Sequence, residues 1–371
     1  MIRCDWFSIA CISSILTLGA LPAMAQSDDQ PISHEAAKIL DQDNDSLAGI
    51  FDLSRYTFRD LTFYWDNDGT VPGVVADSDR YYTNGNAIEL SFNPNLTPAL
   101  ASRIAISDKE NQRFGVGIAI KHRIYTPTSI LLTNPPARDH PYAGYLALAL
   151  SFQRADDHIH DHFGLDLGII GHTSGAETLQ KFIHNAFPDE NTPVGWDTQL
   201  PTEPTINFTF TRTWKTDRAN FGGVGGVGGI EMEMLPSLGF DVGTVLISAR
   251  SSMILRVGKN LPSDFGPATM LGQKDHTVRV SQSSNSKWSI YAYTRLGVDA
   301  IARDLFLDGP VFSGSRSAQR EPLVATFSFG LITRYKSFYL GWNQNIQSER
   351  FDLQPNSQSW GSIVLGCSFD W

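Results

Sequence analysis

Cysteine is scarce in this chain. Three cysteines occur among 371 residues, and two of them, Cys4 and Cys11, lie in an N-terminal segment with the features of a cleaved leader. Removal of that segment would leave Cys367, and a single thiol cannot form an internal disulfide. The sequence therefore excludes a small secreted domain held together by disulfides.

Long apolar runs and excess positive charge are also missing. Beyond the N-terminal segment there is no run of about 18 apolar residues, which excludes membrane-spanning helices. The formal net charge is −10, whereas a nucleic-acid-binding face needs clustered lysine and arginine. We therefore expect no nucleic-acid partner.

The N-terminus carries the pattern of an export signal. A short basic start precedes the apolar stretch Trp6–Leu21, and Ala23-Met24-Ala25 follows directly. The apolar stretch is short for a membrane anchor and runs into a cleavage pattern, so residues 1–25 are predicted to be a signal peptide. Residues 26–56 are polar and acidic and are predicted to form an N-terminal extension.

From residue 57 onward, apolar side chains alternate with small or polar ones, as in residues 114–121 and 363–371. A period of two sends alternate side chains to opposite faces of a sheet. A soluble sandwich also alternates, but its strands are usually about five or six residues long. The segments here are longer, and small residues line one face, which favours a closed barrel.

The sequence thus predicts an all-β fold, a closed antiparallel transmembrane β-barrel of about twelve strands over residues 57–371, in the bacterial outer membrane. The predicted strands are 57–66, 83–93, 113–124, 142–154, 160–172, 203–215, 227–238, 243–257, 286–302, 322–335, 337–349 and 359–371. An even strand number puts both termini on the periplasmic side, so each odd-to-even connection faces outward. The pattern gives no account of the long connection 259–285.

Aromatic residues fit this prediction. Trp65, Tyr142 and Trp371 either belong to the aromatic girdles that barrels carry at the membrane interfaces or pack within the protein, and the pattern favours the girdles. The chain ends on Trp371 inside its last strand, and this ending resembles the C-terminal signal that the barrel-insertion machinery recognises. We therefore expect that machinery and the outer-membrane lipids as partners.

Polar residues gather at the predicted outward rim. The connection after the fifth strand contains a predicted short helix, residues 176–186, in which Gln180 and His184 stand four apart and share one face. Asn67 and Asp68 end the first strand, and Thr83 begins the second. The barrel topology, and not sequence distance, is what brings these five residues to one rim.

These residue types suit ester hydrolysis. An imidazole takes a proton from water near neutral pH, and the oxygens of Asn67 and Asp68 suit Ca²⁺, which would polarise an ester carbonyl. Other interpretations stay open from the residues alone, because a loop histidine such as His184 is often merely solvated and an Asn-Asp pair after a strand is often a turn.

At these residues the sequence resembles the outer-membrane lipid A 3-O-deacylase family. The resemblance covers about residues 60–371 and rests on separate motifs in a specific order. They are Asn67-Asp68, residues 79–85 (Asp-Arg-Tyr-Tyr-Thr-Asn-Gly), Tyr125-Thr126-Pro127, residues 141–144 (Pro-Tyr-Ala-Gly), the Gln180–His184 helix, residues 195–200 (Gly-Trp-Asp-Thr-Gln-Leu), residues 264–267 (Asp-Phe-Gly-Pro) and residues 306–309 (Phe-Leu-Asp-Gly).

The resemblance implies a calcium-dependent hydrolase that removes the 3-O-linked acyl chain of lipid A, the anchor of lipopolysaccharide, in the outer leaflet. It implies that His184 is the general base, that Asp68 with Asn67 and Thr83 holds Ca²⁺ and the oxyanion region, and that Gln180 orients the water or the substrate. Glu190 would match another polar residue of the site.

The chain departs from the family at three places. No lysine stands near Leu131-Leu132, His172 stands where a proline is usual, and His140 stands where an arginine is common. These changes bear on which acyl chain is accepted more than on the reaction. The alternative function is a non-enzymatic outer-membrane barrel that binds lipid or forms a pore. No nucleophile-elbow pattern favours a serine hydrolase such as outer-membrane phospholipase A.

Overall fold

The computed structural model describes most of the chain from residue 55 onward. The described residues are 55–68, 80–107, 111–186, 192–222, 229–267, 269–271, 274–276 and 286–369. The predicted signal peptide, nearly all of the predicted extension, Glu190 and Trp371 lie outside these residues.

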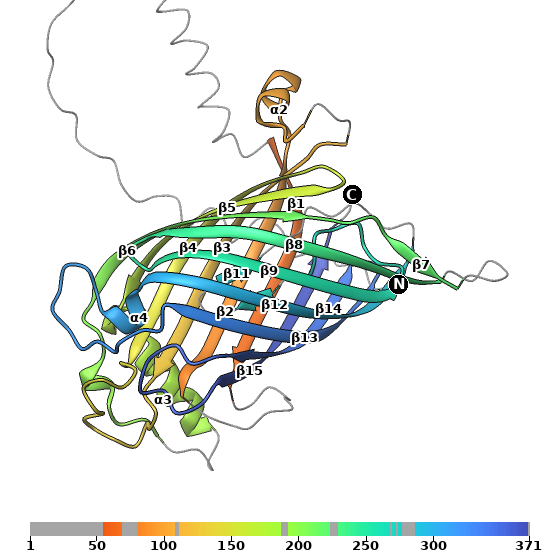
Figure 1. Ribbon diagram of the computed structural model, residues 1–371. Coiled ribbons are helices and arrows are strands. Elements are labelled where there is room, and N and C mark those ends of the chain that lie inside the picture. The colour runs from red at the N-terminus through yellow and green to blue at the C-terminus, as the bar shows by residue number, and fades with distance from the viewer. Residues whose placement is uncertain are drawn as a thin grey trace, which may run out of the picture. The chain divides into compact units, whose positions relative to one another are not determined.

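Twelve antiparallel strands form one closed sheet (Figure 1). They are β1 (Tyr56–Asn67), β2 (Tyr81–Pro94), β3 (Arg113–Thr126), β4 (Ala143–Ala155), β5 (Ile159–Ile170), β6 (Glu203–Trp214), β8 (Ile230–Gly243), β9 (Leu246–Lys259), β12 (Trp288–Asp304), β13 (Leu323–Tyr335), β14 (Phe338–Gln347) and β15 (Gln358–Ser368). Each pairs with the next, β1 pairs with β15 and β6 with β8, so the ring closes. The predicted twelve-stranded barrel is confirmed.

Short helices and 3-10 turns lie at the two ends of the barrel. The helices are α2 (Pro98–Ile104), α3 (Ala176–Ala186) and α4 (Leu305–Asp308), with the 3-10 turns η2 (His172–Ser174) and η3 (Trp196–Thr198). We call the end that carries α3 and α4 the α3 end, and the opposite one the α2 end (Figure 1). Among the described residues, no helix combines the length and the apolar character needed to cross a membrane.

The remaining strands are short. β7 (Ala219–Phe221) pairs with the start of β8. β10 (Thr269–Leu271) and β11 (Lys274–His276) form a separate hairpin that lies against β1 and β15.

The alternation predicted from the sequence sorts the side chains between two environments. Phe63 and Ile88 point away from the barrel and are exposed, whereas Tyr64 beside Phe63 points inside and donates its hydroxyl hydrogen bond to Glu89 at 2.9 Å. Buried charges in the interior are paired, as with Lys121 and Asp166 at 3.1 Å, because an unpaired buried charge is costly. The apolar outer wall is what a lipid-facing barrel requires.

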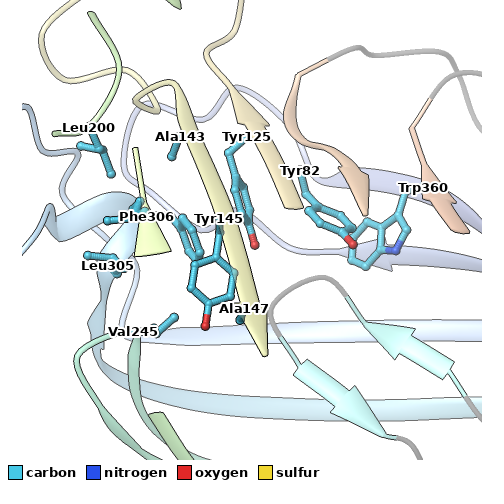
Figure 2. Close-up of a cluster of buried hydrophobic side chains, with 11 residues drawn as sticks. Tyr82, Tyr125, Ala143, Tyr145, Ala147, Leu200, Val245, Leu305, Phe306 and Trp360 are labelled. Carbon is cyan, nitrogen blue, oxygen red and sulfur yellow. The ribbon is translucent and has the colours of Figure 1, made fainter. Parts of the chain in front are cut away.

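An aromatic cluster fills the barrel at the α3 end (Figure 2). The helix α4 brings Phe306 into the interior, where its ring stacks on Tyr125 with centroids 4.1 Å apart. Tyr82 meets Trp360 edge to face at 5.4 Å. The carboxylate of Asp304 caps α4 by accepting the backbone N–H of Phe306 at 3.0 Å. Large rings on both sides of the interior therefore close this end.

The connection after β9, which the sequence pattern did not explain, enters the barrel at the α2 end. Leu261 is buried among interior residues, and Phe265 stacks on His160 with centroids 5.3 Å apart. Arg256, fully buried, pairs with Glu233 and with Asp264 of the connection. Residues 261–265 thus form a strap held inside the barrel by buried charge, and strand periodicity carries no information about it.

Candidate active site

The helix α3 packs on the outer face of the barrel wall. Side-chain register shows the face: Asn67 pairs with Asn84, Asn84 with Ile124, and Ile124 with Gly144. Directly paired residues share a face, so these four residues form one row on the wall. The row points outward, because Tyr125 follows Ile124 in the chain and points inside. Ile124 belongs to one apolar cluster with Ala176 of α3.

Gly144 makes this close packing possible. A Cβ atom built on Gly144 would overlap the Oγ atom of Ser174 and the Cβ atom of Ala176. Ala176 opens α3 and has no side-chain torsion with which to move aside. Any larger residue at position 144 must therefore push the start of α3 away from the wall.

We predict that Gly144→Ala lowers the rate of the ester hydrolysis expected from the sequence by more than tenfold while the barrel still folds. The reason is that a displacement of about 1 Å at a catalytic site costs up to about a hundredfold in rate. The rate on a lipid ester and the heat-dependent gel mobility of the folded barrel would be measured. Gly297→Ala is the matched control, because its Cβ would meet nothing nearer than Ser252 Cβ at 3.6 Å. Equal rates for both variants would contradict the prediction.

The start of α3 follows from local sequence. Gly175 adopts a left-handed φ of 76° that ends η2 and opens the helix. The hydroxyl of Ser174 donates to the carbonyl oxygen of Gly171 at 2.7 Å and accepts from the backbone N–H of Ala176 at 3.4 Å. The predicted helix is thus present, and Ser174 caps its start.

The helix presents Gln180 and His184 on its buried face. They are 2% and 5% exposed, whereas Phe182 between them is 70% exposed. Four residues of helix separate them by about 6 Å along the axis, so both side chains reach the same region. Trp196 of η3 donates its indole N–H to the Oε1 atom of Gln180 at 2.9 Å.

The ends of β1 and β2 are joined around Thr83. The carbonyl oxygen of Thr83 accepts from Asn67 Nδ2 at 3.3 Å and from the backbone N–H of Asp68 at 3.2 Å. The Asp68 carboxylate, which is nearly buried, accepts from the backbone N–H of Arg80 at 2.7 Å. These contacts hold a carboxylate, an amide and a backbone carbonyl together where β1 ends and β2 begins.

A β-bulge aims Thr83 at the outer face. The β2–β3 register shifts between Tyr82 and Asn84, so Thr83 is the extra residue. Its hydroxyl lies 2.7 Å from that of Thr126, two residues beyond the outward-pointing Ile124. Thr83 therefore contacts Asn67 and Asp68 of β1 through its carbonyl oxygen and Thr126 of β3 through its hydroxyl.

All five predicted residues that the structure describes lie at the α3 end. Asn67, Asp68 and Thr83 stand at the ends of β1 and β2, and α3 covers β3 and β4 beside them. Neighbouring strands are about 4.8 Å apart, so the two groups are separated by about 10 Å of wall. A single lipid headgroup can span such a distance. Glu190 is outside the described residues.

The donors present fit a hard cation. In the part of the chain that the structure describes, no three His, Cys, Asp or Glu side chains are grouped to share a metal ion. A cation here would instead use Asp68, the Oδ1 atom of Asn67 and the hydroxyl oxygen of Thr83. An all-oxygen set of this kind suits Ca²⁺ and not a thiolate-preferring or imidazole-preferring metal.

Several supporting residues had no role in the sequence analysis. Trp196, Thr126 and Gly144 all lie within motifs that carried the family resemblance, but their contacts depend on strands meeting in space. Tyr142, predicted to lie at the membrane interface, is 1% exposed and packs on Trp196 with centroids 4.8 Å apart. That prediction is wrong, because the α3 connection covers this tyrosine.

His122 donates from Nε2 to the carbonyl oxygen of Ser174 at 3.1 Å and ties β3 to η2.

The two histidines singled out in the sequence analysis differ in environment. The His172 side chain is largely exposed and lies 3.7 Å from the Glu177 carboxylate. His140 is buried against Tyr125 with ring centroids 5.5 Å apart. Burial, assisted by nearby Arg350, lowers the pKa of His140 to about 3. His140 is therefore a neutral side chain that packs against the interior ring of Tyr125.

Comparison with known proteins agrees with this architecture. The family described as outer membrane protein LpxR matches residues 10–369. LpxR from Salmonella typhimurium is 14% identical with a TM-score of 0.66, over 84% of this chain and 100% of that chain. The β domain of the Bordetella autotransporter Brka is 10% identical with a TM-score of 0.41, over 85% of this chain and 100% of that one. A search of curated proteins found no match.

Proposed function

The chain belongs to the outer membrane protein LpxR family, and we propose on this premise that it hydrolyses the 3-O-linked acyl ester of lipid A with His184 as general base and Ca²⁺ as cofactor. One observation carries the proposal: the face of α3 with Gln180 and His184 is packed on the outer, lipid-facing wall of the barrel, beside the oxygen donors at the ends of β1 and β2. A site on that wall is directly accessible to a membrane lipid.

The chemistry requires a base, a water molecule and a stabilised oxyanion. His184 takes a proton from water as the water oxygen bonds to the ester carbonyl carbon. The tetrahedral intermediate then breaks the bond to the 3-oxygen of the sugar, and the imidazolium returns its proton to that oxygen. A calcium ion held by Asp68 and Asn67 would supply positive charge near the carbonyl oxygen. The products are a free fatty acid and a 3-hydroxyl on lipid A.

The surroundings of α3 suit an acyl substrate. Phe182, Leu131, Leu132 and Val194 are exposed apolar side chains of this region. The backbone N–H of Val194 donates to the carbonyl oxygen of Ile130 at 3.0 Å, so the two connections that carry these residues lie side by side. Exposed apolar patches of this kind mark lipid or ligand contacts. If the even strand number sets the orientation as expected, the α3 end faces the cell exterior, where lipid A lies.

The alternative of a pore is not favoured by the interior. The stacked rings of Tyr125 and Phe306 occupy the interior at the α3 end, and the strap residues around Asp264 occupy it at the α2 end. Between them, a cavity of about 40 Å³ lies next to Lys121 and Asp166, which is space for a few water molecules. A conducting barrel needs a continuous channel.

The proposal is tested by the lipid A of cells that express the full chain. Mass spectrometry should show loss of the mass of one 3-O-linked acyl group relative to cells with an empty vector. Addition of a chelator during incubation of isolated membranes should prevent the loss. An unchanged lipid A profile would contradict the proposal for that host, and release of fatty acid from glycerophospholipid instead would show that the substrate class is wrong.

A further inference from the structure

The side-chain amide of Gln180 has a defined orientation. Its Oε1 atom accepts the indole N–H of Trp196 at 2.9 Å, and both side chains are almost fully buried. An indole N–H only donates, so the atom that faces it must be the amide oxygen. The Nε2 group of Gln180 consequently points elsewhere, and it is buried with no hydrogen-bond acceptor among the described residues.

Trp196 is itself held rigidly. Its ring packs on Tyr142 and joins one apolar cluster with Ile124 and Ala176. The Tyr142 hydroxyl donates to the carbonyl oxygen of Ile130 at 3.2 Å, and the backbone carbonyl of Trp196 accepts from Gln199 at 3.0 Å. The indole thus has a fixed place between α3 and the wall, and it does not have to be ordered when a substrate binds.

A buried donor without an acceptor costs free energy, so its presence in a folded protein needs an explanation. A ligand that supplies the missing acceptor is one such explanation. The unpartnered Nε2 group belongs to the helix face that also carries His184, four residues away. An oxygen atom bound in front of this face would accept from Gln180 while the imidazole acts on the attacking water.

We propose that Trp196 is a positioning residue that makes Gln180 a hydrogen-bond donor to an oxygen of the reacting group, either the ester carbonyl oxygen or the attacking water oxygen. This inference rests on the proposed function. It excludes the opposite role, in which Gln180 Oε1 would accept a hydrogen bond from the attacking water. Without the indole, the amide can turn over and present its oxygen to the site.

Gln180→Glu separates the two roles. A carboxylate of nearly the same shape still accepts from Trp196, but when ionised it has no N–H or O–H to donate. The donor role predicts a fall in kcat of about a hundredfold with KM within about threefold, as for loss of one oxyanion donor. The acceptor role predicts that kcat is kept. A kept kcat would therefore overturn the inference.

Trp196→Phe removes the indole N–H and keeps an aromatic ring in the cluster. We expect kcat to fall by about tenfold, with the barrel still folded by gel mobility, because a misoriented group lowers kcat without abolishing binding. In the Gln180→Glu background the same change should have no additional effect. Both oxygens of a carboxylate are acceptors, so Trp196 has no donor end to orient. If Trp196 only supported the fold, the losses of kcat from the two substitutions would multiply in the double variant. Trp214→Phe, at the far end of β6, is the matched control.

The outcomes are distinguishable from failure of the proposed function. If the wild-type chain leaves lipid A intact, the proposed activity is wrong. If the wild-type chain removes the acyl group and Trp196→Phe has the wild-type kcat, the activity stands and the positioning role is wrong. Multiplied losses in the double variant would also overturn the positioning role.

Discussion

Replacement of His184 by asparagine is expected to lower the rate of lipid A ester hydrolysis by about a hundredfold to ten-thousandfold, the range for loss of a general base. Asparagine has a comparable size and remains polar, so the packing of the α3 face should survive. The rate would be measured on purified barrel in mixed micelles with lipid A, from the fatty acid released.

The matched control for this prediction is His172→Asn. His172 lies in the same connection, but its side chain is 80% exposed. It should retain the wild-type rate within about twofold, as expected for an exposed side chain away from the chemistry. The general-base role would be untenable if His184→Asn kept more than about a tenth of the wild-type rate, or if both histidine variants lost activity equally.

The barrel was predictable from the sequence because strand periodicity is local. Alternation at residues 114–121 requires only that one face of β3 meets lipid and the other meets the interior. Predicted strand boundaries agree with the structure within a few residues, as for β3 (Arg113–Thr126) against 113–124. The short helix was predictable for the same reason, since Ser174 and Gly175 act on adjacent residues.

The organisation of the site was only partly predictable. Strand parity placed Asn67 and His184 at the same end, but it does not say whether α3 lies inside the barrel or on its wall. That choice depends on Gly144, whose missing side chain lets the helix approach. The strap around Asp264 was not predictable either, because Arg256 holds it through side-chain pairing and not through periodicity.

For the same reason, residues that pack and residues that serve the chemistry are hard to separate within one motif. In the segment Gly-Trp-Asp-Thr-Gln-Leu of residues 195–200, Trp196 contacts Gln180 directly, while Leu200 belongs to the aromatic cluster of the interior. One short segment therefore serves both the outer wall and the barrel core. Spacing in the sequence identifies the segment but not the side on which each residue acts.

Removal of calcium is expected to abolish activity, and Asp68→Asn is expected to raise the calcium concentration for half-maximal rate by at least about tenfold. The physical reason is that Asp68 is the charged member of an otherwise neutral oxygen set, and the charge count of the ligands strongly tunes Ca²⁺ affinity. Calcium binding to detergent-solubilised barrel would be measured by titration calorimetry, together with the calcium dependence of the rate.

Asp352→Asn supplies the control for this last prediction. Asp352 also lies at the α3 end and pairs there with Arg138, so the variant changes net charge equally without touching the ends of β1 and β2. Only Asp68→Asn should weaken calcium binding, and high calcium should restore much of its rate. If chelation left the wild-type rate unchanged while His184→Asn abolished it, then Asp68 and Asn67 would stabilise the oxyanion region without a metal, and the imidazole would retain its role as the base.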